Sequence, residues 1–196
     1  MKKLVGLTGK TGAGKSTISE YLSKKGAYVI DGDIIARVVL EKDKTLLPSL
    51  CDAFGDILFE DGTLDRKKLA LKAFSTPENT KLLNSIMHPA INKLIHKESE
   101  KAFLSHEVVV VDAAAIIESG FADECDLLIV VQAPVSVRME RIMKRDNITK
   151  EDALVRINGQ KEDSFYTSKA DFVVNNYEPF ITADELSIAE KEIFGA

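Results

Sequence analysis

The residues with the clearest chemistry form a glycine-rich stretch near the N-terminus, which fits the pattern GxxxxGK(S/T) from Gly9 to Ser16. Glycines let the backbone curl until successive N–H groups face one anion, and a helix that begins there adds partial positive charge. Lys15 would supply a full charge to the β- and γ-phosphates, and the Ser16 hydroxyl could bind Mg²⁺. The alternative is a glycine-rich turn without a ligand. We expect a nucleoside triphosphate to be bound by Gly9, Lys10, Thr11, Gly12, Ala13, Gly14, Lys15, Ser16 and Thr17.

Three aspartates follow expected strands, whose carboxyl ends line the ligand crevice of an α/β sheet. Asp31 and Asp33 end the segment VIDGD, and Asp112 ends VVVVD. If the strand continues, Asp31 and Asp33 share a face; if the chain already turns, only one of them points into the crevice. Asp33 could orient and deprotonate an acceptor hydroxyl, or it could cap a helix that begins at Ile34. Asp112 could hold Mg²⁺ through water, or it could be an ordinary residue at a strand end.

Three arginines at helical spacing supply the cations that phosphoryl transfer requires. Arg138, Arg141 and Arg145 form one stripe on an expected helix. Such a stripe could belong to a lid that closes on phosphates and stabilises the transferring charge. The alternative is a solvated helix face, with Glu140 and Asp146 as neighbouring acids.

The elements that must position these residues alternate between strands and helices. Strand character is found at residues 3–8, 27–33, 107–113, 125–133 and 170–176. Helical patterns cover residues 15–25, 134–160 with a break near 146–149, and 179–194. Runs of β-branched residues such as VVVV are typical of strands that are buried on both faces. We therefore expect an α/β fold with a mostly parallel sheet flanked by helices.

The long segment between the second and third strands has a different character. Residues 33–106 contain helical patterns and no convincing strand, and we expect Pro48, Pro77 and Pro89 to break the helices into pieces. Residues 40–105 are therefore expected to form a helical insertion beside the sheet.

Composition sets outer limits on the function. The chain has 196 residues, of which 45% are apolar, and a formal net charge of -5. That size suits one well-packed domain, and the negative charge argues against nonspecific nucleic-acid binding. The apolar runs are too short to cross a membrane. Cys51 and Cys125 form no CxxC pair, so we expect neither a disulfide framework nor a zinc site, and a reducing cytoplasm.

These segments together resemble the dephospho-coenzyme A kinase family along nearly the whole chain. The resemblance is carried, in order, by GLTGKTGAGKST, VIDGDIIAR, the helical segment 64–91 with its His88-Pro89, RMERIMKRDNITKEDALVRINGQ and ADFVVNN. The loop alone is shared widely among nucleotide-binding proteins, whereas the later segments are much more specific to this family.

The resemblance implies a P-loop kinase core that spans residues 1–196 as a single domain, with a helical coenzyme-binding insertion at about 40–105 and a lid at about 113–146. It implies transfer of phosphate from ATP, with Mg²⁺, to the ribose 3′-hydroxyl of dephospho-coenzyme A. Asp33 matches the family's catalytic acid, Arg141 its lid arginine and Asn176 the asparagine near adenine. With Lys15, Asp33 and Arg141 form the expected catalytic set, and Ser16 and Asp112 the expected Mg²⁺ ligands. No nucleic-acid or membrane partner is implied, and the oligomeric state stays open.

Some positions depart from the family pattern. Lys10 adds a charge beside the phosphates. Residues 113–117 are AAAII, whereas the family usually has a proline and larger apolar residues there, and this difference affects the shape of the acceptor pocket. Arg138 stands where glutamine is common, so we expect it to matter less than Arg141. Two alternative functions follow: a kinase for another small acceptor such as a nucleoside monophosphate, and a regulator that binds ATP without transferring phosphate.

Overall fold

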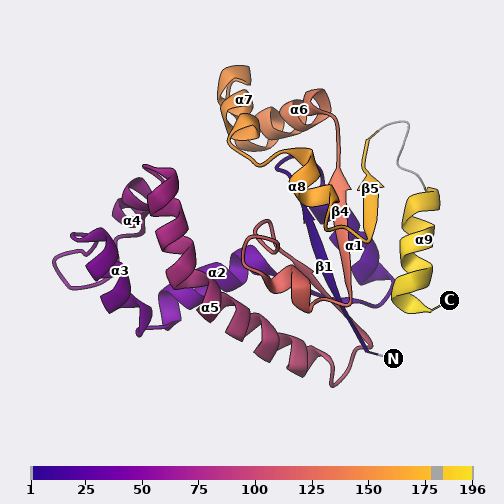
Figure 1. The fold of residues 1–196 in the computed structure, drawn as a ribbon, viewed down its shortest axis with the longest axis horizontal. Helices are drawn as coiled ribbons and strands as arrows, with labels where there is room; N and C mark the ends of the chain where they lie inside the picture. The colour runs from indigo at the N-terminus through magenta and orange to yellow at the C-terminus, as the bar shows by residue number, and fades with distance from the viewer. Residues whose placement is uncertain (1, 178–182, 196) are drawn as a thin grey trace. The chain divides into compact units, whose positions relative to one another are not determined.

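The computed structural model describes residues 2–177 and 183–195, and the chain divides into two compact units. The sheet unit comprises Met1–Gly32 and Glu98–Ala196, and the helical unit comprises Asp33–Lys97. In the described residues of the sheet unit, five strands pair in parallel in the order β2-β3-β1-β4-β5 (Figure 1). They are β1 (Lys3–Gly9), β2 (Tyr28–Asp31), β3 (Val108–Asp112), β4 (Leu127–Gln132) and β5 (Phe172–Asn175). The expected α/β fold and its parallel sheet are confirmed.

Both faces of the sheet are covered, which explains the continuous apolar runs. On one face, Val5 and Leu7 of β1 pack with helix α1 (Lys15–Lys24) and helix α9 (Ala183–Phe194) in a single core cluster. Figure 1 shows α9 beside β5 at the edge of the sheet. On the other face, Ile116 and Phe121 are fully buried. Strands that are covered on both faces bury the side chains of both faces, so their sequences do not alternate between apolar and polar residues.

The parallel register brings the functional ends of the strands together. Asp31 of β2 lies opposite Asp112 of β3, and Asp112 lies opposite Leu7 of β1. Gly9, the last residue of β1, lies opposite Val131 of β4. The glycine-rich stretch therefore leaves the sheet between β3 and β4, at the edge where the two aspartates end their strands.

Helices α6 (Val135–Asp146) and α7 (Lys150–Asn158) follow β4, and the short helix α8 (Asp163–Thr167) precedes β5. The expected break near 146–149 is confirmed: Asn147 has φ 52°, and Thr149 caps α7 by accepting a hydrogen bond from the Asp152 backbone N–H. Ile142, Ala153 and Ile157 pack together, so α6 and α7 form one helical pair.

The helical unit is formed largely by α2 (Gly32–Lys42), α3 (Leu46–Phe54), α4 (Arg66–Ala73) and most of α5 (Pro77–Ala102). The expectation that proline breaks these helices is confirmed at Pro77, where a new helix begins after α4 has ended at Ala73, and was wrong for Pro89, which lies inside α5. Pro77 begins α5 and Pro48 lies in the first turn of α3, where a backbone N–H has no partner within the helix. Pro89 lies inside α5 and cannot donate to the Ser85 carbonyl, yet burial of Met87 and Ile95 on the same helix stabilises it.

Two further expectations concern thiols and membranes. Cys51 and Cys125 are both free thiols. Burial raises the pKa of Cys125 to about 12, so this thiol is unreactive near neutral pH. Within the described part of the chain, no helix combines the length and apolar character needed to cross a membrane.

Candidate active site

The glycine-rich stretch connects the end of β1 to the start of α1. Gly14 precedes the helix with φ 92°, and no side chain caps the first turn of α1. Within the loop, the Ala13 N–H donates to the Lys10 carbonyl at 3.0 Å, and the Thr17 N–H donates to the Gly14 carbonyl at 3.1 Å. A helix N-terminus without a side-chain cap leaves backbone donors for an anion, as the motif requires.

Side chains from outside the loop bind its carbonyl groups. Arg141 donates to the Gly12 carbonyl at 3.3 Å and to the Ala13 carbonyl at 3.1 Å. The Asn176 amide donates to the carbonyls of Ala13 at 3.0 Å and Gly14 at 3.2 Å. Because a trans peptide is planar, its N–H points opposite to its carbonyl. The N–H groups of Gly14 and Lys15 therefore point away from Arg141 and Asn176, toward the side where phosphates would bind.

Close neighbours of the loop explain two of its glycines. A Cβ atom on Gly12 would lie 2.7 Å from the Arg138 carbonyl oxygen, and one on Gly14 would lie 2.0 Å from Asn176 Nδ2. Both glycines also have positive φ, 78° and 92°, which side chains rarely adopt. The protein itself requires glycine at both positions, independently of any ligand.

Lys15 and two aspartates meet at the carboxyl edge of the sheet. Lys15 Nζ lies 3.5 Å from Asp112 Oδ1, and Asp31 is the neighbour of Asp112 across the strand pair. Burial raises the pKa of Asp112, while the Lys15 ammonium and the Ser19 hydroxyl lower it in part. The partly buried Asp112 carboxylate and the Ser16 hydroxyl, expected as the metal ligands, are both hard oxygen donors, which Mg²⁺ prefers. The described residues contain no cluster of three or more His, Cys, Asp or Glu side chains suited to a metal.

The two aspartates of VIDGD do not share a strand face, because β2 ends at Asp31 and α2 begins at Gly32. Of the two alternatives, the one in which the chain already turns is the observed one. The residue between the two aspartates is glycine, since a Cβ on Gly32 would lie only 2.5 Å from Ala113 Cβ. Asp33 lies in the first turn of α2 rather than before a helix that begins at Ile34, so it is not the expected cap. Its catalytic role stays a prediction.

The arginine stripe divides into residues with different partners. Arg138 is only 3% exposed and donates to the Thr11 carbonyl at 2.8 Å, so the solvated-face interpretation is wrong for it. Arg141 also donates to the Asn176 carbonyl at 2.8 Å, so its whole guanidinium group faces the loop and the end of β5. Arg145 is exposed and pairs with Asp146, as the solvated-face alternative describes. A catalytic role for Arg141 stays a prediction.

Asn176, expected near adenine, is 3% exposed and follows β5 directly. Its amide group binds the loop carbonyls, so it is part of the support of the loop. A contact with adenine stays a prediction. The departing segment Ala113–Ile117 places Ile116 and Ile117 in the core, and the Ala114 carbonyl accepts from the Thr8 hydroxyl at 3.2 Å.

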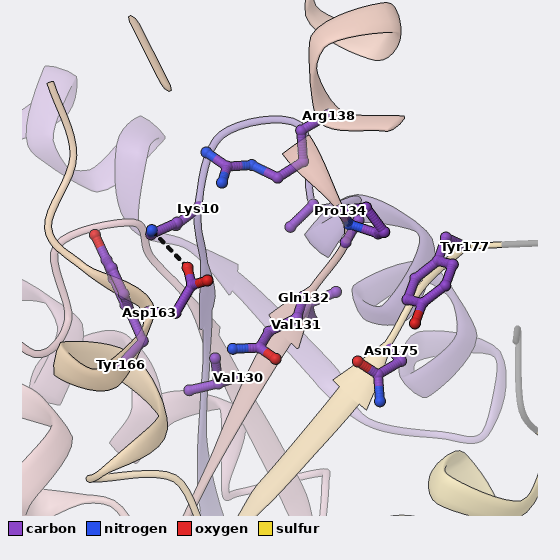
Figure 2. A pocket seen from close by; sticks show the side chains of 12 residues that line it. Lys10, Val130, Val131, Gln132, Pro134, Arg138, Asp163, Tyr166, Asn175 and Tyr177 are labelled. Atoms are coloured by element: carbon purple, nitrogen blue, oxygen red, sulfur yellow. Dashed lines mark ion pairs between the residues drawn. The ribbon is translucent and has the colours of Figure 1, made fainter. Parts of the chain in front are cut away.

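The structure adds residues that sequence reasoning missed. A cavity of about 220 Å³ lies beside the loop at the ends of β4 and β5, and Figure 2 shows Lys10 paired with Asp163 along its wall. Gln160, two residues after α7, accepts a hydrogen bond from the Thr11 N–H at 3.0 Å. Gln160 is the last residue of a segment that carried the family resemblance, but nothing in the sequence indicated its role, and Asp163 belongs to no motif.

Comparisons with known proteins agree with this geometry. The model of the dephospho-CoA kinase family matches residues 3–180. The dephospho-CoA kinase of Listeria innocua is 41% identical over 180 residues, which cover 91% of this chain and 90% of the relative. That of Corynebacterium jeikeium is 38% identical over 175 residues, which cover 88% and 89%. A solved structure of dephospho-CoA kinase from Campylobacter jejuni matches with a TM-score of 0.69 at 27% identity, covering 100% of this chain and 99% of the other. This chain belongs to the dephospho-CoA kinase family.

Proposed function

We propose that this chain transfers the γ-phosphoryl group of ATP to the ribose 3′-hydroxyl of dephospho-coenzyme A, giving coenzyme A and ADP. The observation that carries the proposal is the supported loop with Lys15 at its end, in a chain that matches the family over residues 3–180. This reaction is the last step of coenzyme A biosynthesis. Two free cysteines fit a reducing cytoplasm as its location.

The phosphates of ATP occupy the loop from Gly9 to Thr17, and Lys15 contacts the β- and γ-phosphates. Ser16 and Asp112 would hold Mg²⁺, which when bound neutralises charge on the phosphate oxygens. Lys15 Nζ lies 3.5 Å from Asp112 Oδ1, so the cation for the phosphates and the carboxylate for the metal meet at the same end of the sheet. Lys10 and Asn176 remain proposed contacts of the nucleotide.

Asp33 orients the acceptor hydroxyl and takes its proton. Lys15 offsets the charge that develops on the transferring phosphoryl group. Arg141 contributes positive charge from behind the loop, since its guanidinium binds the Gly12 and Ala13 carbonyls. Catalysis by these groups is mainly positioning and electrostatic stabilisation, as is usual for phosphoryl transfer.

The helical unit, Asp33–Lys97, is proposed to bind the coenzyme part of the acceptor. The lid is proposed to be the helical pair α6 and α7, because the range 113–146 also contains β4, a central strand of the sheet. A central strand cannot move without breaking two ladders of hydrogen bonds.

The test is an ADP-release assay with Mg²⁺-ATP and three acceptors: dephospho-coenzyme A, adenosine monophosphate and cytidine monophosphate. We expect ADP release with dephospho-coenzyme A alone, with coenzyme A confirmed by mass. Lys15→Met is the control for a contaminating kinase. Phosphorylation of a nucleoside monophosphate instead would overturn the acceptor, and ATP binding without ADP release on any acceptor would indicate a regulator.

A further inference from the structure

We propose that Gln160 and Arg138 are positioning residues that set the conformation of the phosphate loop through the backbone of Thr11. The proposal rests on the proposed function, because its importance for catalysis assumes that the loop binds ATP. Neither side chain belongs to the glycine-rich stretch. Arg138 lies in α6 and Gln160 lies two residues after α7, so both belong to the helical pair that we have proposed as the lid or to its immediate continuation.

Three hydrogen bonds close a ring around Thr11. Arg138 Nε donates to the Thr11 carbonyl at 2.8 Å, and the Thr11 N–H donates to Gln160 Oε1 at 3.0 Å. The same oxygen of Gln160 accepts from an Arg138 guanidinium nitrogen at 2.9 Å. Both polar groups of the Thr11 backbone are therefore bound by side chains that are themselves bonded to each other.

Burial makes this ring costly to break. Arg138 is 3% exposed, and burial lowers its pKa while the nearby Asp163 and Tyr166 raise it in part. A buried guanidinium must keep its hydrogen-bond partners, since an unpaired buried donor costs more than the bond itself contributes. The planar guanidinium serves the Thr11 carbonyl and Gln160 at once, which a lysine ammonium at this position could not do with the same geometry.

A second contact joins the loop to helix α8 and is weaker. Lys10 pairs with Asp163 and lies 6.0 Å from the centre of the Tyr166 ring. Figure 2 shows the Lys10 and Asp163 pair on one side of the loop and Arg138 on the other. The Asp163 side chain is 72% exposed, and exposed ion pairs contribute little. We therefore assign the positioning effect to Gln160 and Arg138 rather than to this ion pair.

The helical pair connects the two positioning residues. Arg138 lies near the start of α6, and Gln160 lies two residues beyond the end of α7. The core of Ile142, Ala153 and Ile157 holds the two helices together. A displacement of helices α6 and α7 would therefore move the backbone of Thr11. Ordering of Thr11 by nucleotide would in turn favour one position of these two helices.

The test compares Gln160→Glu with Gln160→Leu. Glu keeps an oxygen that accepts from both donors, whereas Leu fills similar space with no acceptor. For Gln160→Leu we expect the KM for ATP to rise roughly 10- to 100-fold, the range that follows from loss of hydrogen bonds to a charged group and to a partly buried N–H. The KM for dephospho-coenzyme A should stay near the parent value. Gln160→Glu should restore most of the loss, which a purely structural role for side-chain volume would not predict.

Direct ATP binding, measured by calorimetry without acceptor, separates this proposal from the proposed function. If the parent protein fails to phosphorylate dephospho-coenzyme A, the proposed function fails, while the difference in ATP affinity between the Leu and Glu variants still tests the ring. Lys144→Met, on an exposed position of α6, is the matched control and should bind ATP as the parent does.

Arg138→Met completes a double-mutant cycle with Gln160→Leu. If the two side chains act as one ring, the ATP affinity of the double variant should be only slightly below that of the single variant with the lower affinity. Should Arg138→Met fail to fold, the two Gln160 variants still decide the matter. A folded Gln160→Leu protein with the parent's affinity for ATP would overturn the proposal, and so would equal losses for Gln160→Leu and Gln160→Glu.

Discussion

The sheet unit and the helical unit present their functional residues in different ways. In the sheet unit, the phosphate loop is bound from outside by Arg138, Arg141 and Asn176 before any ligand arrives. The helical unit begins with Asp33, which lies in the first turn of α2. We propose that the donor side of the reaction is preorganised by the sheet unit, whereas the acceptor side depends on the helical unit. Variants in the two units should therefore fail in different kinetic parameters.

The largest effect is expected at Asp33. Asp33→Asn keeps the size of the side chain but cannot take a proton, so kcat should fall by on the order of 10²–10⁴-fold. ATP affinity should persist, because the residues that hold the loop belong to the sheet unit. The measurements are kcat with dephospho-coenzyme A and ATP affinity by calorimetry.

Asp31→Asn is the matched control for Asp33, since it removes the other carboxylate of the same segment. It should cost less in kcat. A folded Asp33→Asn protein that retained most of its kcat would remove the catalytic assignment and leave Asp33 as a favourable charge in the first turn of α2.

Lys15→Met should have the next largest effect, on the donor side. Loss of one preorganised cation at the transferring phosphate should lower kcat by about 10²- to 10³-fold and weaken ATP binding. The melting temperature should change little, because the loop carbonyls are held by other side chains. Unchanged turnover in the folded variant would contradict the phosphate-binding role of the loop.

Asn176→Ala tests the outer support of the loop without removing charge. It deletes the donors to the Ala13 and Gly14 carbonyls, so the KM for ATP should rise about 10-fold, as expected for two neutral hydrogen bonds. Asn176→Asp should be no better, because a carboxylate cannot donate to a carbonyl. Steady-state kinetics with each substrate varied would check this, and a rise confined to the KM for dephospho-coenzyme A would contradict the division between the two units.

The smallest effect concerns stability at Asp112. Burial raises the pKa of this carboxyl in the folded protein above its unfolded value. Its favourable contribution is therefore present below the unfolded pKa and is lost as pH rises through the folded pKa. Without Mg²⁺ or nucleotide, Asp112→Asn should melt slightly higher than the parent near neutral pH, while activity falls.

That difference should vanish in acid, where the carboxyl is protonated in both states. Melting curves of both proteins across pH would measure it. A variant that melts lower than the parent at neutral pH would show that the ion pair with Lys15 outweighs the cost of burial.

The fold was predictable because local patterns carried it. Runs such as Val108–Val111 are buried on both faces, and Asn147 ends α6 where the sequence predicted a break. The loop and its Lys15 were predictable from spacing alone. Pro89 misled because burial of the surrounding helix outweighs its missing hydrogen bond.

The support of the loop was not predictable in the same way. Arg138 contacts Thr11 across 127 residues of sequence, and Gln160 contacts it across 149. Neither spacing has a local signature, because the contacts depend on how α6 and α7 pack beside the sheet. Sequence reasoning favoured Arg141 over Arg138, whereas the structure places both guanidinium groups on loop carbonyls.

The two crowded glycines bear on how this chain's relatives should be judged. Gly12 and Gly14 are required by the neighbouring Arg138 backbone and Asn176 side chain, so replacing either would damage folding before it damaged binding. A descendant that had lost its activity would still be under selection to retain both. The presence of both glycines therefore indicates that the fold is retained, and not that the protein is active. The side chains of Lys15 and Ser16 lie outside the core, and erosion at those two positions would mark a lineage that no longer handles nucleotide.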